Sequence, residues 1–242
     1  MSRRRLLLAA TAALAVIAPL FAGVVVTHHA EQRISRVAAC RLAPVGHVSA
    51  TLDSSLAPVK LLGGSIGDVD IHAGQLERQG TSMDLDAHLR QVTTSGASQG
   101  GDATVTIPYA QLVKRLPTVG SGTPWTAGTD GTGLTFTGTT GTLGIPVTVH
   151  ADITLGANTL IVTPTEVTVL GRTVPVDALP GEAMDKSTAQ RLKPREVPLT
   201  ALPSGVRATG AKATSEGLAV HLALTADATR KAAKAASGCA AA

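Results

Sequence analysis

Aromatic side chains are scarce in this chain of 242 residues, since Phe, Trp and Tyr together make up 2% of it. Beyond the first 26 residues, the only ones are Tyr109, Trp125 and Phe136. Carbohydrate platforms and single-stranded nucleic-acid surfaces both need exposed aromatic rings on which a sugar or a base can stack. The composition therefore argues against both classes of ligand.

A large excess of positive charge is also lacking. The formal net charge is +4, but Arg3, Arg4 and Arg5 precede a hydrophobic run and belong to a targeting signal. Without these three arginines the formal charge falls to +1, which is too small for an electrostatic footprint on DNA or RNA. We therefore expect no nucleic-acid partner.

Cysteine is limited to Cys40 and Cys239, one near each end of the chain. In an oxidising compartment this pair predicts a disulfide, which would stabilise the fold by roughly 5 kcal/mol in the chain-entropy model. The chain has no Cys-x-x-Cys, His-Glu-x-x-His, phosphate loop or dinucleotide fingerprint. We therefore predict no metal, no cofactor and no catalytic residue.

One long hydrophobic run is present, from Leu6 to Val26. It exceeds the ~7 to 15 residues of a signal-peptide core and approaches the ~20 that span a bilayer. Residues 1–26 are therefore predicted to be either a signal peptide or an N-terminal membrane anchor. The positive-inside rule places the remainder outside the cytoplasm. We expect an exported protein of the cell envelope, secreted or anchored on the extracytoplasmic face of the plasma membrane.

Alternation of apolar and polar residues dominates the rest of the chain and predicts strands with one dry and one wet face. A glycine-rich turn at 63–67 leads into a strand predicted at Val69–Ala73, in which Val69 and Ile71 alternate with aspartates. Further strands are predicted at Met83–Val92 and Ala103–Ile107. These strands predict a sheet that begins directly after the glycine turn.

The remaining segments complete an α+β domain that is mainly antiparallel β. Short alternating pairs between turns at 126–176 predict a meander, and residues 196–224 close the domain with further strands. Helices are predicted at Thr27–Leu42, Leu56–Leu62, Pro108–Leu116 and Leu179–Leu192. One domain at 27–226 is expected, followed by an alanine-rich tail at 227–242.

Two groups of residues match patterns that can carry chemistry. Ser65 lies in a Gly-x-Ser-x-Gly pattern, but the nucleophile elbow needs a helix after the serine, and here a strand follows. Asp84, Asp86 and His88 share one strand face, which is an arrangement that can hold a metal. A glycine turn and a solvated sheet face are the favoured interpretations. An envelope hydrolase that uses Ser65 or the Asp84/Asp86/His88 face remains an alternative.

An aliphatic sheet with a membrane address suits an apolar, flexible ligand such as an acyl chain. We predict that acyl chains lie against apolar side chains and that a nearby cation meets the phosphate. The predicted lipid-binding residues are Leu61, Leu62, Val69, Ile71, Leu85 and Leu89, with Lys60 and Arg90 as cations. A two-layer core without a cavity, in an interaction domain, is a further alternative.

Two stretches resemble a known family. The sequence Leu-Leu-Gly-Gly-Ser-Ile-Gly-Asp-Val-Asp-Ile at 61–71 resembles the opening motif of the LmeA-like phospholipid-binding proteins of actinobacterial cell envelopes. The segments Val197–Val206 and Glu216–Val220 resemble the C-terminal signature of the same family. The resemblance covers residues 30–226, with its specific motifs at the two ends.

The resemblance implies an exported, non-catalytic domain that binds phospholipid, particularly anionic inositol lipids. It also implies a role in the assembly of mannose-containing envelope glycolipids. The fold that it implies is a tubular lipid-binding fold, in which a single curled antiparallel sheet wraps around a long helix. Phospholipid and membrane are the expected partners.

Overall fold

The computed structural model describes residues 35, 47–52, 64–78, 80–114, 125–140, 144–156, 159–179, 192–199 and 202–236. Strands hold 66% of these residues, and every strand pairing is antiparallel. The prediction of mainly antiparallel β structure is therefore confirmed.

Six strands form the first sheet, sheet A, in the order β1-β2-β3-β4-β12-β11. The bounds are β1 (Val48–Leu52), β2 (Ser65–Arg78), β3 (Thr81–Thr93), β4 (Gly100–Pro108), β11 (Val206–Ala213) and β12 (Gly217–Thr225). The strands predicted after the glycine turn are confirmed, and each extends beyond its predicted ends.

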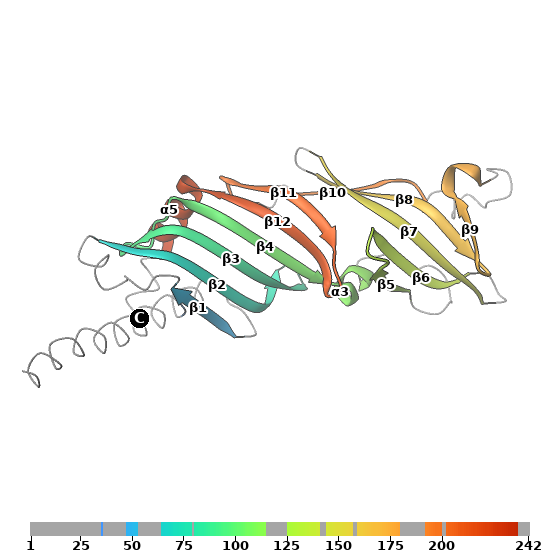
Figure 1. Ribbon diagram of the computed structural model, residues 1–242, viewed down its shortest axis with the longest axis horizontal. Coiled ribbons are helices and arrows are strands. Elements are labelled where there is room, and N and C mark those ends of the chain that lie inside the picture. The colour runs from blue at the N-terminus through green and yellow to red at the C-terminus, as the bar shows by residue number, and fades with distance from the viewer. Residues whose placement is uncertain are drawn as a thin grey trace, which may run out of the picture.

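The threonine-rich middle of the chain forms a second sheet, sheet B, in the order β10-β8-β7-β6-β5, with β9 also paired to β8. The bounds are β5 (Thr126–Thr129), β6 (Leu134–Thr140), β7 (Ile145–Leu155), β8 (Thr159–Val169), β9 (Arg172–Pro175) and β10 (Arg195–Pro198). Sheet B is inserted between β4 and β11, and the two sheets lie end to end along the long axis of the molecule (Figure 1).

The prediction of a single sheet is not confirmed, because the described strands divide between two sheets. The chain leaves sheet A after β4, builds sheet B, and returns at β11 to pair with β12. Alternation within a strand reports which side chains share a face, but it carries no information about the neighbouring strand. The division into two sheets was therefore not visible in the local pattern.

Short helices lie beside the sheets. The helix predicted at Pro108–Leu116 is confirmed as α3 (Tyr109–Lys114), and a 3-10 turn, η1, spans Val176–Ala178. The alanine-rich tail begins with a helix, α5 (Ala226–Ala236), which contacts β4 and β12. The Thr225 hydroxyl accepts the Ala228 N–H at 3.3 Å, as an N-cap does.

None of the helices among the described residues is long and apolar enough to cross a bilayer.

Several predictions fall on residues outside the described ranges. They are the leader at 1–26, the helices at Leu56–Leu62 and, for most of their length, at Thr27–Leu42 and Leu179–Leu192, and the Cys40–Cys239 disulfide. These remain predictions, and so does the long helix around which the sheet was expected to wrap.

Irregularities in register bend β2 and β3. The register between these strands shifts between Ser65 and Gly67, at Gln75 and at Gln91, and both glutamines have positive φ, at 55° and 48°. A carboxylate of the neighbouring strand accepts each freed backbone N–H: Asp84 accepts that of Gln75 at 2.9 Å, and Asp68 accepts that of Gln91 at 2.8 Å. Bulges of this kind increase the local twist and curve the sheet.

The cores of the two sheets join where β11 lies beside β7. Leu160 of sheet B is buried in one cluster with Leu218 and Leu222 of sheet A. In a second cluster, Leu134 of sheet B is buried with Ala213 of sheet A. The two sheets therefore share apolar packing at their junction.

Candidate functional site

Sheet A carries an unbroken apolar face, in which three rows of register partners run across all six strands. We call this set the apolar face of sheet A. In strand order its rows are Leu52, Val69, Leu89, Gly101, Leu224 and Val206; Ala50, Ile71, Ala87, Ala103, Leu222 and Ala208; and Val48, Ala73, Leu85, Val105, Val220 and Ala211.

Four of the predicted lipid-binding residues lie together on this face. Val69 pairs with Leu89 in the first row, Ile71 lies in the second row, and Leu85 lies in the third. Val69 is buried, whereas Ile71, Leu85 and Leu89 are half-buried. The structure therefore brings these four side chains onto one surface.

The predicted cations are placed differently. Arg90 is exposed and follows Leu89 in β3, so strand alternation directs it to the opposite, polar face. Lys60, Leu61 and Leu62 lie outside the described residues. A phosphate bound by Arg90 would therefore lie on the polar side of sheet A.

The rows are long enough to cover an acyl chain. Six strands make five steps of about 4.8 Å, so each row extends for about 24 Å. An acyl chain in one leaflet of a bilayer spans about 15 Å of hydrocarbon. A row is therefore longer than an acyl chain, and the half-buried members of the rows, such as Leu85 and Leu89, are the ones that have surface left to contact a ligand.

Sheet B continues the apolar surface beyond the junction. One of its rows crosses five strands and consists of Ala127, Phe136, Val149, Val167 and Val174. Ile153 and Leu155 of β7 pack against the shared core beside the buried Leu160. Apolar side chains therefore extend from sheet A into sheet B.

The opposite face of sheet A carries cross-strand pairs of histidine and aspartate. His72 Nδ1 lies 2.6 Å from Asp86 Oδ1, and His88 Nδ1 lies 2.7 Å from Asp70 Oδ1. The hydrogen bond to Asp70 raises the pKa of His88 above its ordinary value, against the smaller opposing effect of burial. Cross-strand histidine–aspartate pairs therefore hold part of the polar face of sheet A.

These pairs separate the three residues of the metal hypothesis. Asp86 bonds to His72, His88 bonds to Asp70, and Asp84 accepts the Gln75 N–H of the bulge. Within the described ranges, no three His, Cys, Asp or Glu side chains are placed to hold a metal ion. Asp84, Asp86 and His88 share one strand face as predicted, but each bonds to a different partner.

Ser65 is the first residue of β2 and pairs with Thr93. Gly64 before it has a φ of 75°, and its carbonyl accepts the Thr94 N–H at 3.1 Å. A turn followed by a strand is the reverse of the strand and helix that flank a nucleophile elbow. The geometry therefore matches the interpretation of this motif as a glycine turn.

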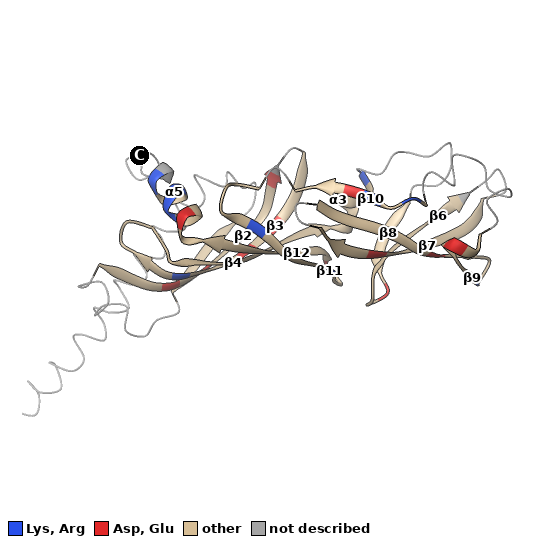
Figure 2. Ribbon diagram, turned by 90° about the horizontal axis from the view of Figure 1, so that it is seen from above, with Lys and Arg blue, Asp and Glu red and all other residues tan. Residues whose placement is uncertain are grey.

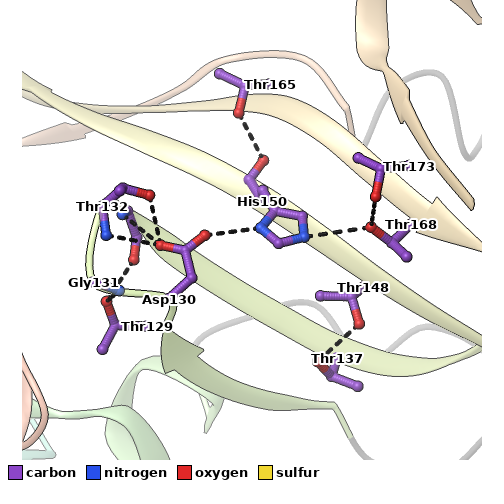
Figure 3. A network of polar contacts seen from close by, with 11 residues as sticks. Thr129, Asp130, Gly131, Thr132, Thr137, Thr148, His150, Thr165, Thr168 and Thr173 are labelled. Carbon is purple, nitrogen blue, oxygen red and sulfur yellow. Dashed lines mark hydrogen bonds and ion pairs between the residues drawn. The ribbon is translucent and has the colours of Figure 1, made fainter. Parts of the chain in front are cut away.

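The polar face of sheet B is built on threonine. Thr126, Thr137, Thr148, Thr168 and Thr173 are register partners across five strands. Their hydroxyls meet at 3.2 Å between Thr137 and Thr148 and at 2.8 Å between Thr168 and Thr173 (Figure 3). Cross-strand threonine pairs of this kind stabilise a sheet.

Asp130 ties the turn between β5 and β6 to β7 (Figure 3). Its Oδ1 accepts the N–H groups of Thr132 and Gly133 at 2.9 Å, and its Oδ2 lies 2.9 Å from His150 Nδ1. The Gly133 N–H, with the Thr132 hydroxyl and His150, holds the pKa of Asp130 well below its usual value. His150 Nε2 lies 3.4 Å from Thr168 Oγ1, which connects the turn to the threonine row.

Charged side chains are scattered along both sheets, and both signs occur together on α5 (Figure 2). Arg230 pairs with Asp227 at 2.9 Å, and Lys231 donates to Ser204 Oγ at 3.1 Å. The helix therefore brings positive charge next to the turn that precedes β11.

A family model of LmeA-like phospholipid-binding proteins matches residues 21–223, which include nearly all of both sheets. The chain belongs to the LmeA-like phospholipid-binding family. No curated protein and no solved structure matches it. Membership of the LmeA-like family supports phospholipid as the ligand.

Part of the apolar face of this LmeA-like protein was missed by sequence reasoning. On the interior strands β4 and β12, Ala103 pairs with Leu222 in the second row and Val105 pairs with Val220 in the third. Each strand alternates visibly in the sequence, but the partners lie far apart along the chain. The pairing of β4 with β12, which would have placed these residues on the apolar face, is not visible in the sequence of either strand.

Proposed function

We propose that this LmeA-like protein is an exported, non-catalytic phospholipid carrier. The acyl chains of its bound phospholipid lie along the apolar face of sheet A. The observation that carries the proposal is the set of three apolar rows that cross six strands without interruption. Leu85, Ala87 and Leu89 in β3 are only half-buried, which leaves apolar surface for a ligand.

Burial of acyl chains supplies enough free energy for a persistent complex. Each buried methylene contributes roughly 0.8 kcal/mol, so about ten methylenes contribute roughly 8 kcal/mol before the costs of association. No charged residue interrupts the three rows. A ligand held in this way would be recognised mainly by its chains.

The export and the cellular role extend the same proposal. The basic start and uncharged run of residues 1–26 support delivery to the extracytoplasmic face of the plasma membrane. The resemblance of the end motifs supports a role in assembly of envelope glycolipids. The protein would hold the lipid while other proteins act on it.

Organic extraction and mass spectrometry of the exported full chain test the carrier function. We expect about one phospholipid per chain. A well-folded protein free of lipid would contradict the proposal and favour an interaction domain.

Matched variants on β3 locate the lipid. Leu85→Gln and Leu89→Gln place polar groups on the apolar face and are expected to lower the lipid content severalfold. Asp86→Gln changes the opposite face of the same strand and should retain the lipid. Arg90→Gln tests the predicted phosphate contact, which would show as a weaker preference for anionic phospholipids.

Catalysis is tested separately with esterase and phosphatase substrates. The partners of Asp84, Asp86 and His88 favour a structural role for these side chains. An activity that disappears in Ser65→Ala, or on addition of a chelator, would contradict the non-catalytic assignment.

A further inference from the structure

The hairpin that joins β8 to β9 ends in an exposed leucine. Leu170 is 72% exposed, and Val169 beside it is 36% exposed. Gly171 and Arg172 complete the tip and are exposed as well. Single exposed apolar residues are ordinary on protein surfaces, so exposure alone does not distinguish this tip.

The backbone of the tip is what distinguishes it. Leu170 has a φ of 49° and Gly171 a φ of 77°, as in a type I′ turn, whose two central residues both have positive φ. Asn, Asp and Gly suit the first of these positions, whereas a bulky side chain is strained there. Leucine at this position therefore combines backbone strain with an apolar side chain in water.

The other positive-φ residues in the described ranges, apart from glycines, have an explanation inside the fold. They are Gln75 and Gln91, and a neighbouring aspartate accepts the backbone N–H of each. Leu170 has neither a polar side chain nor a buried position that would offset its strain. A strained residue that the fold does not need is a reason to look for a function.

The location and charge of the tip indicate a partner. The hairpin lies at the end of the long axis away from β1 (Figure 1). Arg172 pairs with Val169 across the hairpin, which places a cation directly beside the apolar residues. Glu166 lies three residues before Val169, or about 10 Å along the strand. The tip is therefore apolar and basic.

We propose that the tip Val169–Arg172 is the membrane-contacting end of the protein, with Leu170 among the acyl chains and Arg172 at the lipid phosphates. A specific protein interface needs roughly 800 Å² on each partner, more than one leucine and one valine provide. A bilayer accepts a small apolar wedge flanked by a cation. The choice of partner rests on the proposed function, because a phospholipid carrier must meet a bilayer to load or release its lipid.

A tryptophan at the tip tests the contact. In the full chain, Trp125→Phe removes the single native tryptophan and Leu170→Trp places the reporter. The vesicles contain equal parts of phosphatidylcholine and phosphatidylglycerol with brominated acyl chains. We expect a blue shift and quenching of the fluorescence.

The matched control is Thr154→Trp in the same Trp125→Phe background. Thr154 is exposed on β7, about 23 Å along the strand from Val147, the partner of Val169. Equal quenching of both variants, or no quenching of the Leu170→Trp protein, would overturn the proposal. A blue shift without vesicles that grows with protein concentration would also overturn it, because a second copy would then be the occupant.

Leu170→Asn provides a second test, because asparagine fits the turn and leaves the fold intact. The rate at which the full chain withdraws fluorescent phospholipid from vesicles should fall roughly tenfold. An unchanged rate would contradict the proposal. Lipid extraction from the Leu170→Trp protein separates the two proposals. Bound phospholipid without quenching would contradict only the membrane contact of the tip. Quenching without bound phospholipid would contradict only the carrier function.

Discussion

Sheets A and B both have one apolar face, but their polar faces differ in chemistry. Sheet A joins its strands with histidine–aspartate pairs, such as His72 with Asp86. Sheet B joins its strands mainly with a row of threonine hydroxyls, such as Thr168 with Thr173, and it also has a histidine–aspartate pair, His150 with Asp130. The threonine-rich middle of the chain therefore forms a sheet that also has an apolar face but has a different polar face.

This difference affects how each sheet responds to pH. A histidine–aspartate pair changes charge within the physiological pH range, whereas a threonine pair does not. The apolar faces, in contrast, meet in a shared core. Substitutions in the core should therefore affect both sheets, and substitutions on the polar faces should affect one.

The largest effect is expected at the junction between the sheets. Among the described residues, Leu134 and Val69 are the largest fully buried side chains, one in each sheet. Leu134→Ala should lower the free energy of unfolding by about 3 kcal/mol and Val69→Ala by about 2 kcal/mol, because each leaves a cavity. Urea denaturation measures both values. A larger loss from Val69→Ala would contradict the central position of Leu134.

Substitution of glycines that lie close to the backbone of a neighbouring strand should give the next largest loss of stability. A Cβ on Gly101 would overlap the carbonyl oxygen of His88 in sheet A, and one on Gly133 would lie 2.6 Å from that of Ala151 in sheet B. Gly101→Ala and Gly133→Ala should each cost about 2 kcal/mol, with the greater loss in sheet A. Gly210→Ala is the control, because its Cβ would meet nothing closer than 3.6 Å.

The strained tip of sheet B should respond in the opposite direction. Leu170→Asn is expected to raise the free energy of unfolding by about 1 kcal/mol, because asparagine tolerates the left-handed conformation. Thermal unfolding measures the gain. Asp68→Ala in sheet A is the contrast, since it removes the acceptor of the Gln91 N–H and should lower stability by about 1 kcal/mol. Stability unchanged in Leu170→Asn would mean that the turn holds leucine without strain.

His88 should contribute to the pH dependence of the stability of sheet A. Because its pKa is raised on folding, the folded state binds this proton more tightly than the unfolded state does. The resulting stability is fully present below the unfolded pKa of about 6.5 and is lost as the pH rises through the folded value. His88→Gln should flatten the melting temperature over that range. An unchanged slope would assign it to another group.

Sheet B should show the opposite dependence, at acidic pH. The pKa of Asp130 is lowered on folding, so its contribution is present above the unfolded value of about 4 and is lost as the pH falls further. Asp130→Asn should reduce the loss of stability between neutral and acidic pH. This carboxylate is well solvated, so the effect should be the smallest of the set.

Much of the apolar face could be predicted from the sequence. The alternation around Val69, Ile71, Leu85 and Leu89 identified side chains that the structure places on one surface. Arg90 was predicted beside them, but alternation itself directs it to the polar face. The same rule that identified the apolar residues thus separates them from their predicted cation.

The sequence by itself determined which side chains share a strand face, because the period of two is a local property of extended backbone. It also determined the turn before β2, where Gly64 takes a positive φ. Only the tertiary structure decided which faces lie side by side. Thr104 of β4 meets His221 of β12 across 117 positions, and His72 meets Asp86 across a bulged register. The first pairing depends on two segments far apart in the chain and the second on a bulge, and the alternation within one strand specifies neither.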